Sequence, residues 1–224
     1  KNISKLNLIF DHRVTQILSD KKRISGCVAK EEKTGSVTEI SADHVVIASG
    51  GIAGDLKRVR KLWNKSLGAP PEIILNGSHH YALGDMHDVV QKMKGKLVHQ
   101  EKMWNYAAGV HHPAGDKDFH GLSLVPPKSA LWLNYEGRRI GPIPLITGYD
   151  TKYLVEEICK QKKKYSWQIL NWKIAVKELA VSGSEYNEAV RDKKIFEFLK
   201  QVRFGNKKLV ADLTENCKDF VVAG

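Results

Sequence analysis

The chain has 224 residues, of which 42% are hydrophobic, and it contains five Trp, seven Tyr and six Phe. This composition excludes a disordered chain, and the length allows one large domain or two small ones. Lys and Arg outnumber Asp and Glu by 36 to 25, which gives a net charge of +11 and a surface expected to attract anions. The longest basic run, residues 160–164, has no recognition helix or aromatic platform beside it. Nucleic-acid binding is therefore the weaker alternative to a solvated basic surface.

Membrane and secretory classes lack support in the sequence. No apolar run approaches the ~20 residues of a membrane-spanning helix, and no apolar segment follows the first five residues as a secretory signal would. We therefore expect a soluble protein, with the cytoplasm as its default location. The three cysteines, Cys27, Cys159 and Cys217, are odd in number and far apart. This favours free thiols in a reducing compartment over a disulfide framework.

Alternating apolar residues and short polar turns mark the first forty residues as β-strands. We predict a β-meander with strands at residues 6–10, 13–18, 24–29 and 37–40, and turns at 19–22 and 33–36.

The next segment has a different pattern. Residues 45–48 are four consecutive apolar residues, three of them β-branched, which is typical of a strand buried on both faces in a parallel sheet. Gly50 and Gly51 end this strand, and helical spacing follows over residues 55–63. A strand, two glycines and a helix let the backbone approach a ligand closely, although an ordinary turn has the same pattern.

The remaining elements are mostly helical. We predict helices at residues 85–93, 152–159, 167–181 and 188–202, and a short strand at 97–98. Aromatic residues and prolines become frequent after residue 100, so we divide the chain into residues 1–100 and 101–224. The fold class predicted is α/β. Two adjacent histidine pairs, at residues 79–80 and 111–112, do not predict a metal site, because neighbouring side chains on a strand point to opposite faces.

Residues 42–51 resemble the Ala-Thr-Gly-Gly signature of the succinate dehydrogenase/fumarate reductase flavoprotein superfamily, which includes the 3-ketosteroid Δ1-dehydrogenases. The resemblance implies a Rossmann-like FAD-binding domain and FAD as the cofactor. It places four residues, Ala48, Ser49, Gly50 and Gly51, beside the dinucleotide. It also implies that Val14 touches the adenine, or is simply a core valine.

Leu83-Gly84-Asp85 resembles the Thr-Gly-Asp-Gly motif of these flavoproteins, which implies that Gly84 and Asp85 lie at the flavin. The alternative is a helix start with Asp85 as its N-cap. Further matches to ketosteroid-dehydrogenase-like proteins follow in order from Met103 to Glu185, and they imply an α+β cap domain, incomplete, over residues 101–224. Trp104 and Tyr106 then form a substrate wall or pack within the cap.

Tyr149 stands where the dicarboxylate enzymes of the superfamily carry a proton-transferring Arg. A hydroxyl there suits a neutral carbonyl substrate, whereas a dicarboxylate requires cationic partners. The resemblance thus implies that Tyr149 is catalytic and that the substrate is a small neutral molecule, a steroid being suggested. Residues 139–143 depart from the Arg-Phe-x-Asn-Glu segment of the steroid enzymes.

The sequence contains no Gly-x-Gly-x-x-Gly pyrophosphate loop after a strand. We therefore expect the central fragment of an FAD-dependent oxidoreductase, inactive by itself, with exposed apolar surface that promotes self-association. The alternative is a non-enzymatic binding or interaction module built on a degenerate flavoprotein cap. Whether the chain is an enzyme is left open by the sequence.

Overall fold

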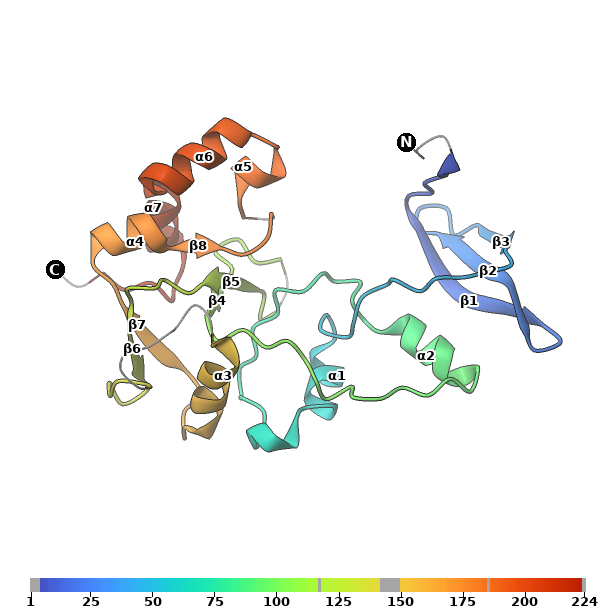
Figure 1. Cartoon of the computed structure of the whole chain (residues 1–224), viewed down its shortest axis with the longest axis horizontal. Coiled ribbons are helices and arrows are strands. Elements are labelled where there is room, and N and C mark those ends of the chain that lie inside the picture. Colours follow the sequence, from blue (N-terminus) through green and yellow to red (C-terminus); the bar gives the residue numbers. More distant parts are fainter. Residues whose placement is uncertain (1–4, 117, 142–149, 185, 223–224) are drawn as a thin grey trace. The chain divides into compact units, whose positions relative to one another are not determined.

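A computed structural model of the chain describes residues 5–116, 118–141, 150–184 and 186–222 (Figure 1). The described residues form two compact units. Unit 1 contains residues up to Asp55 together with His80–Gln100, and unit 2 contains Leu56–His79 together with the residues from Glu101 onward. Both units have antiparallel sheets, so the fold is a mixed α/β one.

Unit 1 is built on the predicted β-meander, which is confirmed over most of its length. Three antiparallel strands, β1 (His12–Asp20), β2 (Arg23–Glu31) and β3 (Val37–Ser41), form a sheet in that order. A two-residue turn joins β1 to β2, and both of its residues, Lys21 and Lys22, have positive φ, as a tight hairpin of right-handed twist requires.

Two of the strands predicted within residues 1–55 do not form. Residues 6–10, which precede β1, do not form a strand, and their apolar side chains are exposed. The predicted buried parallel strand at 45–48 is likewise absent, and Val46 is 88% exposed. A parallel strand needs a hydrogen-bonding neighbour and cover on both faces. In the described part of unit 1, the only sheet is the antiparallel meander, which offers neither.

Helix α2 (Asp85–Lys92) completes unit 1, as the sequence predicts. It contacts β1 and buries Met86. Just after the helix ends, the amide of Gly95 donates a hydrogen bond of 2.9 Å to the carbonyl of Val90. The short strand expected at residues 97–98 does not form.

Unit 2 contains two small antiparallel sheets. The first has the order β4 (Gly109–His111), β5 (Gly121–Val125) and β8 (Ala180–Val181), and the second pairs β6 (Leu131–Asn134) with β7 (Ser166–Ile169). Residues 56–79 join this unit through Asn76, whose amide donates to the carbonyl of Phe119 over 2.8 Å. The amide of Gly121 donates back to the carbonyl of Asn76 over 3.0 Å.

The helices of unit 2 are short. They are α1 (Leu56–Lys61), the 3-10 helix η2 (Lys65–Leu67), α3 (Thr151–Lys160), α4 (Trp172–Glu178), α5 (Glu188–Arg191), α6 (Ile195–Phe204) and α7 (Lys207–Asn216). The core between helices and sheets is centred on three side chains of zero exposure, Trp132, Leu154 and Leu213. The indole Nε1 of Trp132 donates to Ser166 Oγ over 2.9 Å, so its one polar atom is satisfied inside the core.

The predicted helices of unit 2 are confirmed in part. Helix α3 matches the helix expected at 152–159. The helix expected at 167–181 is wrong at both ends, because residues 166–169 pair with β6 as β7 and residues 180–181 pair with β5 as β8. The helix expected at 188–202 is divided into α5 and α6 at Lys193, which has a φ of 56°.

Candidate cofactor-binding site

The residues expected at the dinucleotide all lie in unit 1. Val14 is on β1, residues 48–51 form the loop that follows the meander, and Gly84 and Asp85 begin α2. Val14 pairs with Ala29 of β2 and is half-buried. This partial burial leaves open both a core role and a contact with a ligand.

The loop at residues 48–51 presents its backbone to solvent. Ala48, Ser49, Gly50 and Gly51 are all exposed. Gly50 has a φ of +75°, a conformation that side chains other than glycine rarely adopt. A Cβ built on Gly50 or Gly51 would meet no atom within 4 Å. The peptide groups here are thus accessible, and a ligand could approach them at hydrogen-bonding distance.

The C-terminal end of this loop is fixed to the rest of unit 1. Ile52 is buried, and its carbonyl accepts a hydrogen bond of 3.0 Å from the amide of Asp55. The amide of Gly54 donates to the carbonyl of Ala82 over 2.9 Å. This bond connects the glycine loop to the segment that leads into α2, so the two candidate motifs share a backbone contact.

Gly84 is the N-terminal residue before α2. It has left-handed φ and ψ of 80° and 21°, and no side chain caps the helix at this end. Its carbonyl accepts the amide of His87 over 2.9 Å and that of Asp88 over 3.2 Å. Asp85 is the first helical residue, so the alternative in which it acts as the N-cap is wrong. Its carboxylate still lies at the positive end of the helix dipole.

Arg13 connects β1 to the start of α2. Its Nε lies 2.9 Å from Glu32 Oε1, its Nη1 lies 3.5 Å from Asp85 Oδ2, and its Cζ lies 4.9 Å from the ring centroid of Tyr81. No role is predicted for Arg13 from the sequence, although it adjoins Val14. The sequence feature that could have indicated a role is the basic side chain itself. As the neighbour of Val14 on β1, it points to the opposite face of the strand.

The residues expected at the substrate belong to unit 2. Trp104 is 81% exposed, Tyr106 is also exposed, and their ring centroids lie 6.4 Å apart. Neither ring is part of the core of unit 2. Tyr149, expected to be catalytic, lies outside the described residues. Asp150, which follows it, caps α3 by accepting a 2.9 Å hydrogen bond from the amide of Tyr153.

The histidine pairs make other contacts. His111 Nδ1 lies 2.8 Å from Asp219 Oδ2, and the ring of His112 stacks on that of His120 at 4.3 Å between centroids. Among the described residues, no group of three or more His, Cys, Asp or Glu side chains could hold a metal ion. Within the same residues, no helix has the length and apolarity to cross a membrane.

Comparison with known proteins assigns the family. Residues 2–220 match the FAD binding domain family. The chain belongs to this family, and its cofactor is FAD. The accessible peptide groups at residues 49–51 fit a phosphate-bearing dinucleotide, because they can offer backbone N–H groups to anionic oxygens.

Three curated relatives are similar in sequence. One is a KsdD-like steroid dehydrogenase of Mycolicibacterium smegmatis, 34% identical over 196 residues, which are 88% of this chain and 36% of the relative. The others are KsdD-like steroid dehydrogenases from two strains of Mycobacterium tuberculosis, each 35% identical over 162 residues, which are 72% of this chain and 28% of the relative. The chain thus spans about a third of the length of the relatives it matches.

Proposed function

We propose that this chain is part of an FAD-dependent dehydrogenase that oxidises a C–H bond of a neutral carbonyl compound, with a steroid as the first candidate. The family match and the names of the relatives support the reaction and the substrate class. The structural observation that carries the proposal is the accessible glycine loop at residues 48–51, joined to the start of α2 by the Gly54–Ala82 hydrogen bond.

Unit 1 would hold the cofactor. In this assignment Val14 contacts the adenine, the backbone of Ala48–Gly51 approaches the dinucleotide, and Gly84 with Asp85 faces its polar groups. Bound FAD supplies a hydride acceptor. Arg13 fixes the orientation of the Asp85 carboxylate at the positive end of α2. Without this cation, the carboxylate and the phosphates of a bound dinucleotide would repel each other.

Residues 101–224 would serve as the substrate-binding cap, apart from the cofactor residues in 1–100. The exposed rings of Trp104 and Tyr106 offer an apolar surface to a flat substrate. Tyr149, in its phenolate form, would accept the proton that leaves the substrate alongside the hydride, so that the C–C unit loses two protons and two electrons in all.

We further propose that the chain by itself is catalytically inactive and tends to self-associate. Apolar side chains at residues 6–10 and at Val46 and Ile47 are exposed in unit 1, and surfaces of this kind promote association. The competing hypothesis, a non-enzymatic binding module, predicts a monodisperse chain without flavin affinity.

Flavin titration of the purified chain tests the proposal. FAD fluorescence anisotropy is measured with the unaltered chain and with Gly50→Ala. The matched control is Gly68→Ala in unit 2, because Gly68 also has a positive φ, +72°, and open space around its Cβ position. Both substitutions place a side chain at a positive φ, which costs at least ~1 kcal/mol of backbone strain. Only Gly50→Ala should weaken FAD binding.

Binding of FAD that is lost in Gly50→Ala and kept in Gly68→Ala supports the cofactor site. A chain that binds no FAD, or that binds it equally in both variants, contradicts this site and favours the binding module. Reduction of a dye acceptor with a 3-ketosteroid by the 224-residue chain alone would contradict its proposed inactivity.

A further inference from the structure

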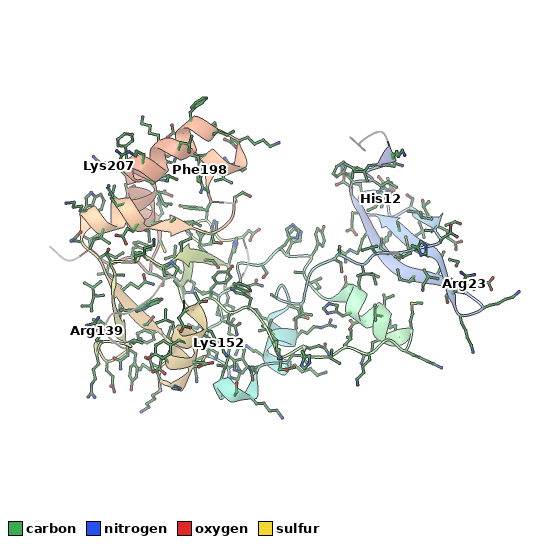
Figure 2. The ribbon with its side chains drawn as sticks, in the orientation of Figure 1. His12, Arg23, Arg139, Lys152, Phe198 and Lys207 are labelled. Atoms are coloured by element: carbon green, nitrogen blue, oxygen red, sulfur yellow. The ribbon has the colours of Figure 1, made fainter. Side chains whose placement is uncertain are left out.

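Helix α6 presents its apolar side chains to solvent. None of its residues is buried, and Phe196 is 89% exposed. The exposed apolar residues of the helix are Ile195, Phe196, Phe198, Leu199, Val202 and Phe204. Figure 2, in which Phe198 and Lys207 are labelled, shows aromatic and basic side chains together along this part of the chain.

Four of these apolar residues share one face of the helix, and Phe196 borders it. Ile195, Phe198, Leu199 and Val202 follow the i, i+3, i+4, i+7 spacing of an amphipathic helix. We call these four residues and Phe196 the α6 stripe. In a globular domain such a stripe normally faces the core, yet here all five side chains are exposed. The polar Gln201, in contrast, is half-buried. The apolar face of the helix is therefore open to solvent, and Gln201 is the one residue of α6 that is not exposed.

Contacts at both ends hold α6 in this orientation. Before the helix, the amide of Lys194 donates to the carbonyl of Ala189 over 2.9 Å. After it, Gly205 has a φ of +89°, and a Cβ there would lie 2.4 Å from the carbonyl oxygen of Val176. The amide of Asn206 donates to that same oxygen over 2.8 Å.

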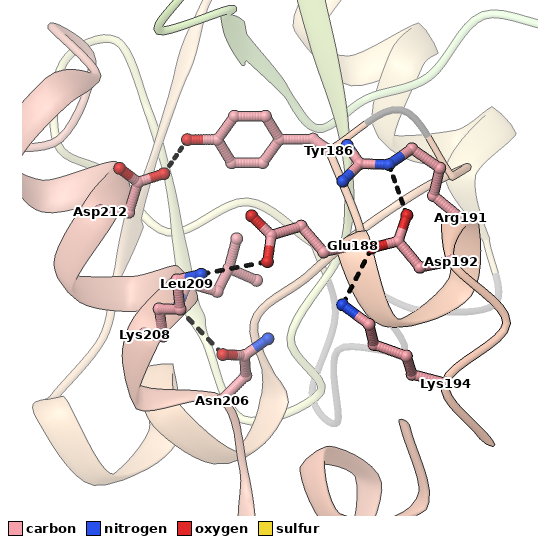
Figure 3. A network of polar contacts seen from close by, with 9 residues as sticks. All are labelled: Tyr186, Glu188, Arg191, Asp192, Lys194, Asn206, Lys208, Leu209 and Asp212. Atoms are coloured by element: carbon pink, nitrogen blue, oxygen red, sulfur yellow. Dashed lines mark hydrogen bonds and ion pairs between the residues drawn. The ribbon is translucent and has the colours of Figure 1, made fainter. Parts of the chain in front are cut away.

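Polar contacts of the neighbouring helices reinforce these ends (Figure 3). Asp192 binds both Arg191 and Lys194 at 3.0 Å, and Lys208 Nζ lies 3.1 Å from Glu188 Oε2. The orientation of α6 thus depends on its flanks and not on burial of the stripe. The stripe is left available for a partner.

Cations surround the α6 stripe. Residues 193–208 contain six Lys or Arg side chains and a single acid, Glu197. All six cations are exposed. Lys194 pairs with Asp192 and Lys208 with Glu188, and we call the other four, Lys193, Lys200, Arg203 and Lys207, the cationic rim. A second copy of this chain docked on the stripe would bring two cationic rims together, which like-charge repulsion disfavours. An anionic surface complements the rim.

We propose that the α6 stripe and its cationic rim are a docking site for an anionic phospholipid surface. The stripe would enter the boundary between headgroups and acyl chains, and the rim would bind the lipid phosphates. A basic amphipathic helix lying in the plane of the membrane interface has this composition. The proposal does not depend on flavin binding.

Vesicle sedimentation of the 224-residue chain tests the stripe. The vesicles are phosphatidylcholine alone and phosphatidylcholine mixed with phosphatidylglycerol. We expect binding to the mixed vesicles, and ~30-fold weaker binding after the double substitution Phe196→Ser and Val202→Ser, because two apolar side chains no longer leave water. The matched control, Phe10→Ser with Val46→Ser, removes equally exposed apolar side chains of unit 1 and should bind like the unaltered chain.

A second pair of variants tests the rim. Lys200→Glu with Arg203→Glu should weaken binding ~30-fold or more and reduce its dependence on salt, since each cation near an anionic surface contributes. Lys162→Glu with Lys163→Glu makes the same change in net charge at two other exposed lysines and should have little effect. A Phe196→Trp variant should show a blue shift of its emission on binding the mixed vesicles.

All the α6 side chains changed are exposed, so the urea midpoint of each variant should match that of the unaltered chain. Absence of binding to the mixed vesicles overturns the proposal, as does binding that the α6 variants leave unchanged. Sedimentation velocity that shows a dimer abolished by the stripe variants, without vesicle binding, would instead identify the stripe as an interface between copies.

Discussion

Arg13 Nη1 lies 3.5 Å from the carboxylate of Asp85, and this contact joins the first strand of unit 1 to the first residue of α2. The two residues are far apart in the sequence, and each adjoins a residue expected at the cofactor. The pair is partly exposed, so its direct contribution to stability is at most ~1 kcal/mol. Its importance is positional, because it holds a carboxylate at the start of a helix that also faces the candidate dinucleotide site.

We predict that Arg13→Ala weakens FAD binding about two- to fivefold, the equivalent of a lost exposed ion pair. The free energy of unfolding should change by less than ~1 kcal/mol. Lys33→Ala is the control, because it removes another exposed ion pair of unit 1, that with Asp11 at 2.5 Å. Anisotropy titration with FAD compares the three chains. An equal loss of affinity in Lys33→Ala would refute the positional role of Arg13.

We predict that Gly205→Ala destabilises unit 2 by ~2 kcal/mol or more. The new Cβ would meet the carbonyl oxygen of Val176 at 2.4 Å and would also have to adopt a φ of +89°. Gly183→Ala has a similar φ of +85° but open space, and should cost only ~1 kcal/mol. Urea unfolding measures both values. Equal costs would show that the contact with Val176 is absent in solution.

We predict an alkaline loss of stability that depends on Tyr186. Burial, and then a hydrogen bond from its hydroxyl to the carboxylate of Asp212, raise the pKa of the Tyr186 phenol in the folded state. The folded state therefore retains this proton where the unfolded state releases it. The stabilisation is complete below about pH 10, the ordinary pKa of tyrosine, and is lost as the pH rises above it.

Tyr186→Phe should flatten the fall in unfolding free energy above about pH 10. Asp212→Asn should keep the larger part of that fall, since burial is the first cause of the raised pKa and remains in this variant. Urea midpoints measured through the alkaline range decide the matter. A Tyr186→Phe profile parallel to that of the unaltered chain would contradict the prediction.

We predict that the three thiols react at different rates. Burial raises the pKa of the Cys159 and Cys217 thiols, which lowers their thiolate fraction at neutral pH. Cys27 is half-buried and should react first with iodoacetamide. Mass spectrometry of timed samples gives the order, and urea should abolish it. Modification of Cys159 or Cys217 as fast as Cys27 in the folded chain would be contrary to the expectation.

The sequence was a good guide where structure depends on nearby residues. The β-meander and helix α3 could be predicted because alternation, turn residues and the Asp150 cap act within a few positions. Helix α7 also had a local signal, Asn206, which caps it by accepting a hydrogen bond of 3.0 Å from the amide of Leu209. That signal was overlooked.

Structure that depends on distant residues could not be predicted. Residues 166–169 alternate polar and apolar side chains as a strand does, but the longer apolar pattern after them favoured a helix, and β7 forms because β6, more than thirty residues earlier, pairs with it. The buried strand expected at 45–48 would require strands on both sides, and the described part of unit 1 contains none beside it. For the candidate site, the glycine loop and the start of α2 could be identified by resemblance, whereas Arg13 became apparent only from its contacts with Glu32 and Asp85.

The assignment of residues 56–79 to unit 2 has a consequence for synthesis and for truncation. The chain leaves unit 1 after Asp55 and returns to it at His80, so no cut at a single position separates the units. A ribosome that has released residues 1–100 has delivered all of unit 1. The segment around Asn76 still awaits residues 119–121, its hydrogen-bonding partners. In shortened chains that end near residue 100, residues 56–79 should therefore lack these hydrogen-bonding partners and be sensitive to proteases.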